Sequence, residues 1–348
     1  ENIGLSKFVS VGNKADLTEN DLLALLRDDE LTDVILLYLE DISDPKRFVK
    51  LSIEITGEIL KKKPILAIKS GRTMEGARAA SSHTGALASS DEAYDSFFFQ
   101  CGVLRVETLE ELFAYAVAFA NQPLPKGDKV AIVTNAGGPG IMATDACVRY
   151  GLKLAPLTRK TVQTLRAGLP PTAGLNNPID VIGDAGADRF DLALRAVLDD
   201  QKVDGAIVIC TPQTMTMLKD ISSVIADVAP RYDKPVLACC MAVQDISESL
   251  QVLDRAKVPH YRFPEAAARA MSNMARYSWW ISRPRTRIKV FKDVDPERVR
   301  TLLERARSEK RRFVPEPEAQ EILKAYGFPV LPFRLAENLK EALQAAKE

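Results

Sequence analysis

Short apolar runs alternate with amphipathic runs along most of this chain, and this alternation constrains its fold more than any other feature. In the first third, the apolar runs that predict buried strands are residues 7–11, 33–39 and 64–68. The stretches with the three-to-four spacing of helices are residues 17–26, 45–60 and 92–99. Strands that alternate with helices predict a parallel sheet covered by helices on both faces.

The same alternation resumes after a proline-containing stretch at residues 122–128, which we take as a domain boundary. The predicted strands of this second part are residues 129–134, 205–210 and 234–240. The predicted helices are residues 141–150, 192–198, 221–228 and 246–256. The fold class that follows is α/β, with two parallel-sheet domains at residues 1–122 and 127–278.

The remaining residues differ from both sheets. Residues 279–312 form a charged, proline-containing linker, in which residues 295–307 predict one helix. Residues 313–348 predict a helix at 316–326, a short strand at 328–331 and a helix at 337–348. This last piece is too short to bury a core of its own, so we expect it to belong to a larger domain.

Composition excludes several classes of protein. Lys plus Arg and Asp plus Glu number 47 each, so no overall positive charge favours nucleic acid or an anionic membrane. Neither a transmembrane run nor a secretory leader is evident. The five cysteines are odd in number and have no CxxC spacing, which predicts buried thiols in a reducing cytoplasm rather than zinc ligands or disulfides.

Two glycine-bearing loops each join a predicted strand to a predicted helix. The first is residues 9–16, where Thr18 with Asp21 three positions later predicts a helix N-cap. The second is residues 134–140, which has three glycines in four positions and therefore allows positive φ. A helix N-terminus offers free backbone N–H groups to an anion, although many such turns bind nothing. The second loop is neither a Walker A motif nor GxGxxG.

A third segment, residues 70–90, is rich in small and polar residues and contains His83, one of only two histidines in the chain. Imidazole has a pKa near ~6.5, so it is largely neutral at cellular pH and can attack a phosphoryl group. Glu40 follows the strand next to the one that precedes His83. Because carboxyl ends of adjacent parallel strands lie side by side, Glu40 can orient the imidazole, although such a residue is often merely solvated.

These motifs together resemble a known family. SKFVSVGNKAD, YLED, IKSGRT…SSHTGALASSDEAYD, GVLRVETLEELF, VTNAGGPG and NPIDVIGDA occur in the order found in the ADP-forming acetyl-CoA or acyl-CoA synthetases, relatives of succinyl-CoA synthetase. The resemblance runs from Ser6 to about Tyr277 and implies two flavodoxin-like domains. EPEAQEILKAYGFPV, within residues 313–348, resembles the beginning of that family's ATP-grasp domain.

The resemblance implies a reaction in three reversible steps. Acyl-CoA and phosphate give acyl phosphate and CoA, the acyl phosphate phosphorylates His83, and the phosphohistidine converts ADP to ATP. Glu40 matches the glutamate that positions the histidine, although Asp41 stands where relatives often carry glycine. The implied phosphate-binding residues are Ser10, Gly12, Asn13 and Ala15 in the first loop, and Asn135, Ala136, Gly137, Gly138 and Gly140 in the second. The residues that support the histidine are Ser82, Thr84 and Gly85.

The resemblance also implies the substrates, the metal ion and the partner domains of the protein. The substrates are CoA, phosphate, ADP or ATP, and acetate or another short-chain acid, and Mg²⁺ is needed at the nucleotide end but no metal at the histidine. A CoA-binding domain and a complete ATP-grasp domain are expected in the same longer chain or on a partner chain. Nucleic acid and membrane are not expected partners, and homo-oligomers are common for such a fold. The acyl group, the choice of ADP or GDP, the direction and the oligomeric state do not follow from these residues.

Two alternatives stay open at this point. Some GNAT-type protein lysine acetyltransferases carry the same synthetase-like region as a ligand sensor, although no acetyltransferase domain lies within residues 1–348. A non-catalytic binding module is the other alternative, and it predicts that His83 is never phosphorylated.

Overall fold

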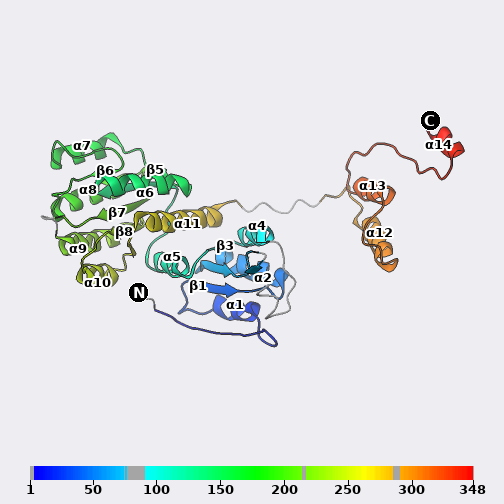
Figure 1. The fold of residues 1–348 in the computed structure, drawn as a ribbon, viewed down its shortest axis with the longest axis horizontal. Coiled ribbons are helices and arrows are strands. Elements are labelled where there is room, and N and C mark those ends of the chain that lie inside the picture. The colour runs from blue at the N-terminus through cyan, green and yellow to red at the C-terminus, as the bar shows by residue number, and fades with distance from the viewer. Residues whose placement is uncertain (1–3, 74, 77–90, 214–216, 285–290, 348) are drawn as a thin grey trace. The chain divides into compact units, whose positions relative to one another are not determined.

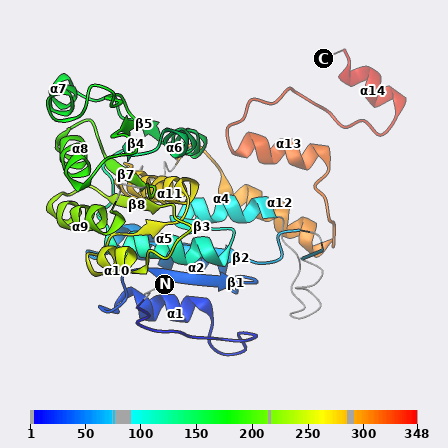
Figure 2. The ribbon, with the colours of Figure 1, turned by 60° about the vertical axis from the view of Figure 1, so that its left-hand side comes forward.

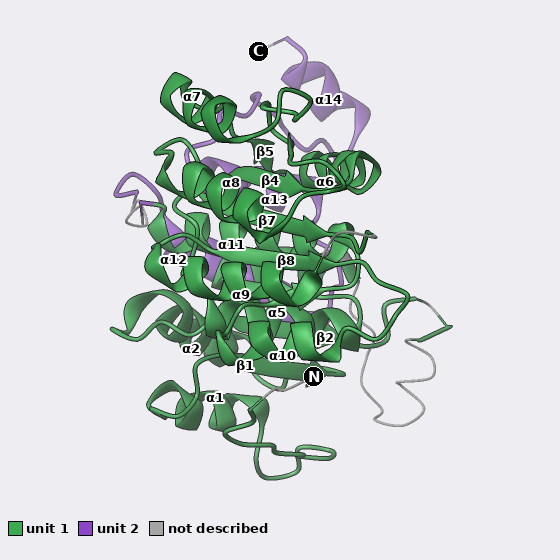
Figure 3. Ribbon diagram, turned by 90° about the vertical axis from the view of Figure 1, so that its left-hand side faces the viewer, with its two compact units in different colours: residues 1–283 green, residues 284–348 purple. Residues whose placement is uncertain are grey.

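A computed structural model describes residues 4–73, 75–76, 91–213, 217–284 and 291–347. The chain divides into two compact units, Glu1–Arg283 and Pro284–Glu348 (Figure 3). Each unit is described by itself below. Within these described ranges, no helix is both long and apolar enough to cross a membrane.

The first sheet of unit 1 has three parallel strands in the order β1-β2-β3 (Figure 1). Their bounds are β1 Ile35–Leu39, β2 Ile65–Lys69 and β3 Val103–Arg105. The helices of this region are α1 Glu19–Arg27, α2 Pro45–Ile53, α4 Asp91–Cys101 and α5 Leu109–Asn121, with a π-helical turn at Glu54–Glu58. Every residue of the central strand β2 is buried, which fits a parallel strand covered on both faces.

The predicted strand at residues 7–11 is wrong. These residues have no regular secondary structure, and the side chains of Phe8 and Val9 are exposed. A strand is stable only when a neighbouring strand pairs with its backbone. In the described sheet, β1 pairs only with β2, and residues 7–11 pair with neither. An apolar run alone therefore did not produce a strand here.

The second sheet has six parallel strands in the order β5-β4-β7-β8-β9, with β6 also paired to β4. Its strands are β4 Lys129–Thr134, β5 Lys153–Leu154, β6 Ile179–Asp180, β7 Gly205–Cys210, β8 Val236–Cys240 and β9 His260–Tyr261. Its helices are α6 Gly137–Arg149, α7 Arg159–Gly168, α8 Ala187–Asp199, α9 Leu218–Val228, α10 Ser247–Arg255 and α11 Pro264–Ser282, with a 3₁₀ turn at Ala229–Arg231. The predicted strands and helices of this region are confirmed, apart from shifts at their ends. The prediction omitted helices α7 and α11 and the two-residue strands β5, β6 and β9.

Helices α5 and α11 join the two sheets. They pack against each other (Figure 2), and α11 also packs on α6 beside the second sheet. One buried cluster contains side chains from both sheets and both helices, including Leu66, Tyr115, Ile207 and Met271. The hydroxyl of Tyr277 on α11 donates a hydrogen bond of 2.9 Å to the carbonyl of Thr56. This shared core explains why residues 1–283 form one unit.

All five cysteines are buried and free of disulfides, as the sequence predicts. Burial raises the pKa of the Cys101 and Cys147 thiols to about 12, so neither is a reactive thiolate near neutral pH.

The described residues of unit 2 contain three helices, α12 Pro296–Ser308, α13 Glu316–Ala325 and α14 Leu339–Ala345. These confirm the three predicted helices, but the predicted strand at residues 328–331 is wrong, because no other strand of the described unit pairs with it. Among the described residues of this unit, only Val299 and Ala306 are buried apolar side chains. The exposed ones include Phe313, Phe328, Leu331 and Leu339. The unit therefore has almost no core of its own.

The unit boundary lies close to the predicted start of the linker. We predicted a linker from residue 279, but α11 continues to Ser282, where the aromatic side chains of Trp279 and Trp280 extend its packing. The predicted division of the chain at residues 122, 127, 278 and 312 stays a prediction.

Candidate active site

The first glycine loop, residues 9–16, leads into α1. Its predicted phosphate-binding residues, Ser10, Gly12, Asn13 and Ala15, are all exposed. Gly12 and Lys14 have positive φ, 55° and 56°, so the backbone turns sharply here. The predicted N-cap is confirmed, since the backbone N–H of Thr18 donates to Asp21 Oδ2 at 3.0 Å in a capping box.

Lys14 ties this loop to the end of β1. Its Nζ donates to both Oδ1 and the carbonyl oxygen of Asp41, each at 2.7 Å, and lies 3.0 Å from Glu19 Oε2. Burial works to lower the pKa of Lys14, but the hydrogen bonds to Asp41 and Glu19 outweigh burial, and the pKa is raised. The loop is thus held beside Glu40 by an ion pair that the sequence analysis did not predict.

The second glycine loop is a helix N-terminus that follows directly on β4. Helix α6 begins at Gly137, so Gly137, Gly138 and Gly140 form its first turn. The glycines would allow positive φ, but none of these three has it. The helix end is open at Gly138, where a Cβ would meet nothing within 4 Å, whereas a Cβ on Gly140 would lie 3.0 Å from the Thr134 side chain. Free N–H groups and the positive end of the helix dipole suit this turn to an anion.

The side chain of Asn135 connects the second loop to Thr211, which follows β7. This buried side chain accepts from the backbone N–H and hydroxyl of Thr211 at 2.9 and 3.0 Å, and donates to the Thr211 carbonyl at 2.8 Å. The Thr134 hydroxyl accepts from the N–H of Ala136 at 3.0 Å. β4 and β7 are adjacent in the sheet, so these bonds fix the segments that follow the carboxyl ends of the two strands relative to each other.

Asp180 lies at the same helix end. It ends β6, which pairs with β4, and its Oδ2 would be 3.6 Å from a Cβ at Gly137. Its Oδ1 accepts from the N–H of Ile182 at 2.9 Å, where Ile182 has a φ of 72°. The sequence analysis missed Asp180 and Thr211 as site residues. Asp180 lies within the NPIDVIGDA motif, whereas Thr211 is signalled only by its place directly after a strand.

Glu40 and Lys69 lie at the carboxyl edge of the first sheet. Leu39 and Lys69 are register partners in β1 and β2, so Glu40 follows on the neighbouring strand as predicted. Glu40 is exposed, whereas Lys69 is 8% exposed and its Nζ lies 4.8 Å from the centroid of the Tyr94 ring. Burial lowers the pKa of Lys69, although Asp91 opposes this shift.

His83 and its supporting residues Ser82, Thr84 and Gly85 lie outside the described residues. The described residues on either side are joined by ion pairs. Arg72 Nε lies 3.4 Å from Asp91 Oδ2, and Arg105 on β3 also pairs with Asp91. Burial works to raise the pKa of Asp91, but its arginine partners outweigh it and the pKa is lowered. Both ends of the histidine segment are therefore fixed to the carboxyl edge of the first sheet.

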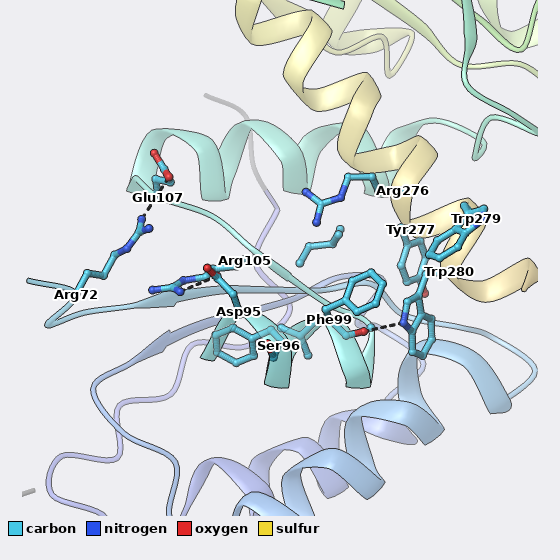
Figure 4. Close-up of a pocket in the computed structure, with 14 residues that line it drawn as sticks. Arg72, Asp95, Ser96, Phe99, Arg105, Glu107, Arg276, Tyr277, Trp279 and Trp280 are labelled. Atoms are coloured by element: carbon cyan, nitrogen blue, oxygen red, sulfur yellow. Dashed lines mark hydrogen bonds and ion pairs between the residues drawn. The ribbon is translucent and has the colours of Figure 1, made fainter. Parts of the chain in front are cut away.

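A cavity of about 610 Å³ adjoins this ion-pair cluster (Figure 4). Figure 4 shows Arg72, paired with Glu107, and Arg105, paired with Asp95, at one end of it. The aromatic side chains of Phe99 and Trp279 stand at the other end, with ring centroids 6.3 Å apart.

The structure brings the predicted residues together in two groups. Loop 9–16 and Glu40 meet at the first sheet through Lys14 and Asp41, and residues 135–140 gather at the second sheet around Thr211. Among the residues that the structure describes, no hydrogen bond or ion pair joins the two loops. In the same described ranges, no cluster of three or more His, Cys, Asp or Glu side chains could hold a metal ion.

Comparison with known proteins identifies the domains. Residues 1–119 match the succinyl-CoA ligase like flavodoxin domain, and residues 130–287 match the ligase-CoA domain. The chain belongs to the ADP-forming acyl-CoA synthetase family. The domain matches cover both sheets and both glycine loops, which confirms the resemblance and the α/β fold inferred from the sequence.

Relatives within this family are ligases. The chain is 41% identical over 350 residues to a 4-hydroxybutyrate–CoA ligase [ADP-forming] of Nitrosopumilus maritimus, covering all of this chain and 49% of that relative. It is 43% identical over 283 residues to acetate–CoA ligase [ADP-forming] II subunit alpha of Pyrococcus furiosus, covering 79% of this chain and 61% of that one. The chain thus spans about half the length of this relative.

A solved structure shows the same fold. It is the dinucleotide forming acetyl-coenzyme A synthetase 1 of Ca. Korarchaeum cryptofilum in complex with phosphate and ADP. That protein is 33% identical to this one, with a TM-score of 0.73 over 78% of this chain and 60% of that chain.

Proposed function

We propose that the protein containing this chain is an acid–CoA ligase that interconverts acyl-CoA, phosphate and ADP with acid, CoA and ATP. The observation that carries this proposal is the match of the flavodoxin and ligase-CoA domains, with the N-terminus of helix α6 open at Gly138 in the predicted phosphate loop. The relatives reported above are ligases, which favours this function over a regulatory GNAT-type acetyltransferase.

The proposed reaction has three steps, and each is reversible. A phosphate oxygen attacks the acyl carbon of acyl-CoA, and the C–S bond breaks to release CoA. A ring nitrogen of His83 then attacks the phosphorus of the acyl phosphate, and the acid leaves as a carboxylate. Finally an oxygen of the ADP β-phosphate attacks the same phosphorus, and the P–N bond breaks to return the imidazole.

The chain's own residues supply charge stabilisation and orientation. We propose that the N–H groups of Gly137 and Gly138 bind the phosphoryl oxygens from one side. Asn135, Ala136 and Gly140 complete this phosphate loop and shape it, since the Ala136 N–H donates to Thr134 and the Gly140 N–H donates to the Ala136 carbonyl. Ser10, Gly12, Asn13 and Ala15 bind the phosphoryl oxygens from the other side, and Ser82, Thr84 and Gly85 support the histidine. Glu40 accepts a hydrogen bond from the far N–H of the His83 ring and so fixes the tautomer in which the attacking nitrogen carries no proton.

The substrates CoA and ADP or ATP follow from the same proposal. Unit 2 exposes its apolar side chains, which supports its assignment to the beginning of an ATP-grasp domain whose remainder lies in the same longer chain or in a partner chain. Mg²⁺ would neutralise phosphate charge at that nucleotide end. We place the protein in the cytoplasm because all five cysteines are unpaired thiols. A homo-oligomer is an expected form.

The test is ATP formation from acetyl-CoA, phosphate and ADP by the complete protein. We expect the unaltered protein to form ATP and His83→Ala to form none, since the only other histidine of this sequence, His260, lies on β9 and is hydrogen-bonded with Asp254. We also expect the 348 residues alone to form no ATP. Turnover that survives in His83→Ala would contradict the proposal. A folded protein that binds acetyl-CoA without turnover would instead support the acetyltransferase-type sensor.

A further inference from the structure

The cavity of about 610 Å³ in Figure 4 runs along β3, which is the last strand of the described first sheet. Helix α4 lines it with Asp95, Ser96 and Phe99, and helix α11 lines it with Arg276 and Trp279. Its volume falls within the range of small-molecule pockets, roughly 300–1,000 Å³. None of these five residues belongs to either glycine loop, so the cavity is separate from the proposed phosphate site.

One end of the cavity is aromatic. Phe99 and Trp279 are 51% and 56% exposed, and their stacked rings have centroids 6.3 Å apart and planes inclined by 25°. The guanidinium of Arg283 lies 5.7 Å from the centroid of the Phe99 ring and 5.9 Å from that of Trp279, which restrains both rings. Two large aromatic side chains that are exposed and held in place form a platform on which a planar ring can stack.

A fixed wall closes this aromatic end. Trp280 is buried, and its indole N–H donates to the carbonyl oxygen of Phe99 at 2.9 Å. The Trp280 ring packs against Gly102, which has a φ of 73° and where a Cβ would lie 2.7 Å from that ring. The aromatic end is therefore preformed, so a ligand that stacks there needs little reorganisation of the protein.

The rest of the lining carries more positive than negative charge, with the arginines Arg72, Arg105 and Arg276 and the carboxylates Asp95 and Glu107. Arg72 pairs with Glu107, and Arg105 pairs with Asp95. Arg276 is exposed and points from α11 toward the space between the two ends of the cavity (Figure 4). Among the residues that the structure describes, Arg276 has no carboxylate partner. A guanidinium without a counter-ion in a cavity is suited to bind a phosphate group.

The length of β3 sets the scale of a ligand. From Gly102 beside the Trp280 ring to Arg105 at the other end, the strand advances by three residues, about 10 Å at the usual rise. An aromatic acid with its carboxylate directly on the ring is too short to use both ends. A nucleoside monophosphate fits, because its ribose separates a planar base from a phosphate.

We propose that this cavity binds a purine nucleoside monophosphate, with its base stacked on Phe99 and Trp279 and its phosphate paired with Arg276. Ser96 offers a hydroxyl to the ribose. Arg72 also pairs with Asp91, so the cationic end adjoins described residues on both sides of the His83 segment. The site is additional to the nucleotide end of the proposed reaction, which does not require it.

The experiment titrates the complete protein with AMP, adenosine and ribose 5-phosphate, and follows binding by calorimetry and by tryptophan fluorescence. Trp279 and Trp280 are the only tryptophans of this sequence, and a base stacked on Trp279 should quench its emission. We expect Arg276→Met to weaken AMP binding on the order of tenfold. The same change should leave the binding of adenosine nearly unaltered, because adenosine has no phosphate.

Arg166→Met is the matched control. Arg166 on α7 is also an exposed helical arginine without a carboxylate partner among the described residues, but α7 packs on α8 beside the second sheet. We expect Arg166→Met to leave the affinity for AMP unchanged. Circular dichroism of each variant shows that it folds.

A second variant tests the aromatic end without touching the charge. Trp279→Phe keeps a ring for stacking, so calorimetry should still detect AMP binding, whereas most of the quenching should be lost. Equal AMP affinity in the unaltered protein and Arg276→Met, or quenching that survives in Trp279→Phe, would overturn this site. Neither result bears on the proposed function, which ATP formation and the labelling of His83 test separately.

Discussion

The two glycine loops of this protein have similar sequence context and different structures. Loop 134–140 follows β4, which has strands on both sides, and a buried asparagine and the first turn of α6 fix its shape. Loop 9–16 follows a segment without any strand partner, and one lysine ties it to Asp41 and Glu19. In this protein, a glycine-rich loop is held by hydrogen bonds and a helix turn where its strand has neighbours on both sides, and is held by a single lysine where it has none.

The largest difference in unfolding free energy is expected between the alanine variants of the two asparagines in these loops. Asn135→Ala should lower the free energy of unfolding of unit 1 by about 2–3 kcal/mol, because it removes the buried Asn135 side chain and leaves the part-buried N–H and carbonyl of Thr211 without these partners. Asn13→Ala, at an exposed position, should change it by less than about 0.5 kcal/mol. Urea denaturation of both variants measures the difference. Equal effects would show that the second loop is no better fixed than the first.

Lys14→Met should have an intermediate effect, about 1–2 kcal/mol, because Glu19 is buried and loses its cation. The folded pKa of Lys14 is raised above 10.5, so its stabilisation is fully present below that pH and is lost as pH rises through the folded value. The difference in unfolding free energy between Lys14→Met and the unaltered protein should therefore stay constant from about pH 6 to 9 and shrink above roughly 10.5. A difference that vanishes already near pH 7 would mean that the ion pair does not hold the loop.

The smallest changes in unfolding free energy should come from two glycine-to-alanine substitutions, and these changes should have opposite signs. Gly12→Ala should destabilise by about 1 kcal/mol, since φ is +55° there. Gly138→Ala should stabilise by about 0.5 kcal/mol, since the residue is helical and a Cβ meets nothing within 4 Å. Thermal unfolding of both variants provides the comparison. The same sign in both would contradict the helical description of the second loop.

The fold of unit 1 was largely predictable, because buried strands such as Ile65–Lys69 and Gly205–Cys210 are continuous apolar runs. The errors at residues 7–11 and 328–331 share one cause. Strand formation depends on a partner strand, which an apolar run does not specify. The two-residue strands, such as β6 with Asp180, are too short to give a pattern at all.

Candidate site residues that directly follow a strand, such as Glu40 and Asn135, could be selected from the sequence. Residues that act through a distant contact could not be selected in this way. Lys14 meets Asp41 across 27 positions, and Asn135 meets Thr211 across 76. Nor could the sequence show that Gly137 begins a helix, because glycine is a weak helix former and the N-terminal turn forms only on the end of β4.

The most direct test of the account is phosphorylation of His83 in the complete protein. We would incubate the unaltered protein and His83→Ala with radioactive ATP and Mg²⁺, and measure acid-labile, base-stable label. The account predicts label on the unaltered protein alone, discharged by a short-chain acid with CoA. Equal label on both proteins, or none on a folded and ATP-binding unaltered protein, would contradict it.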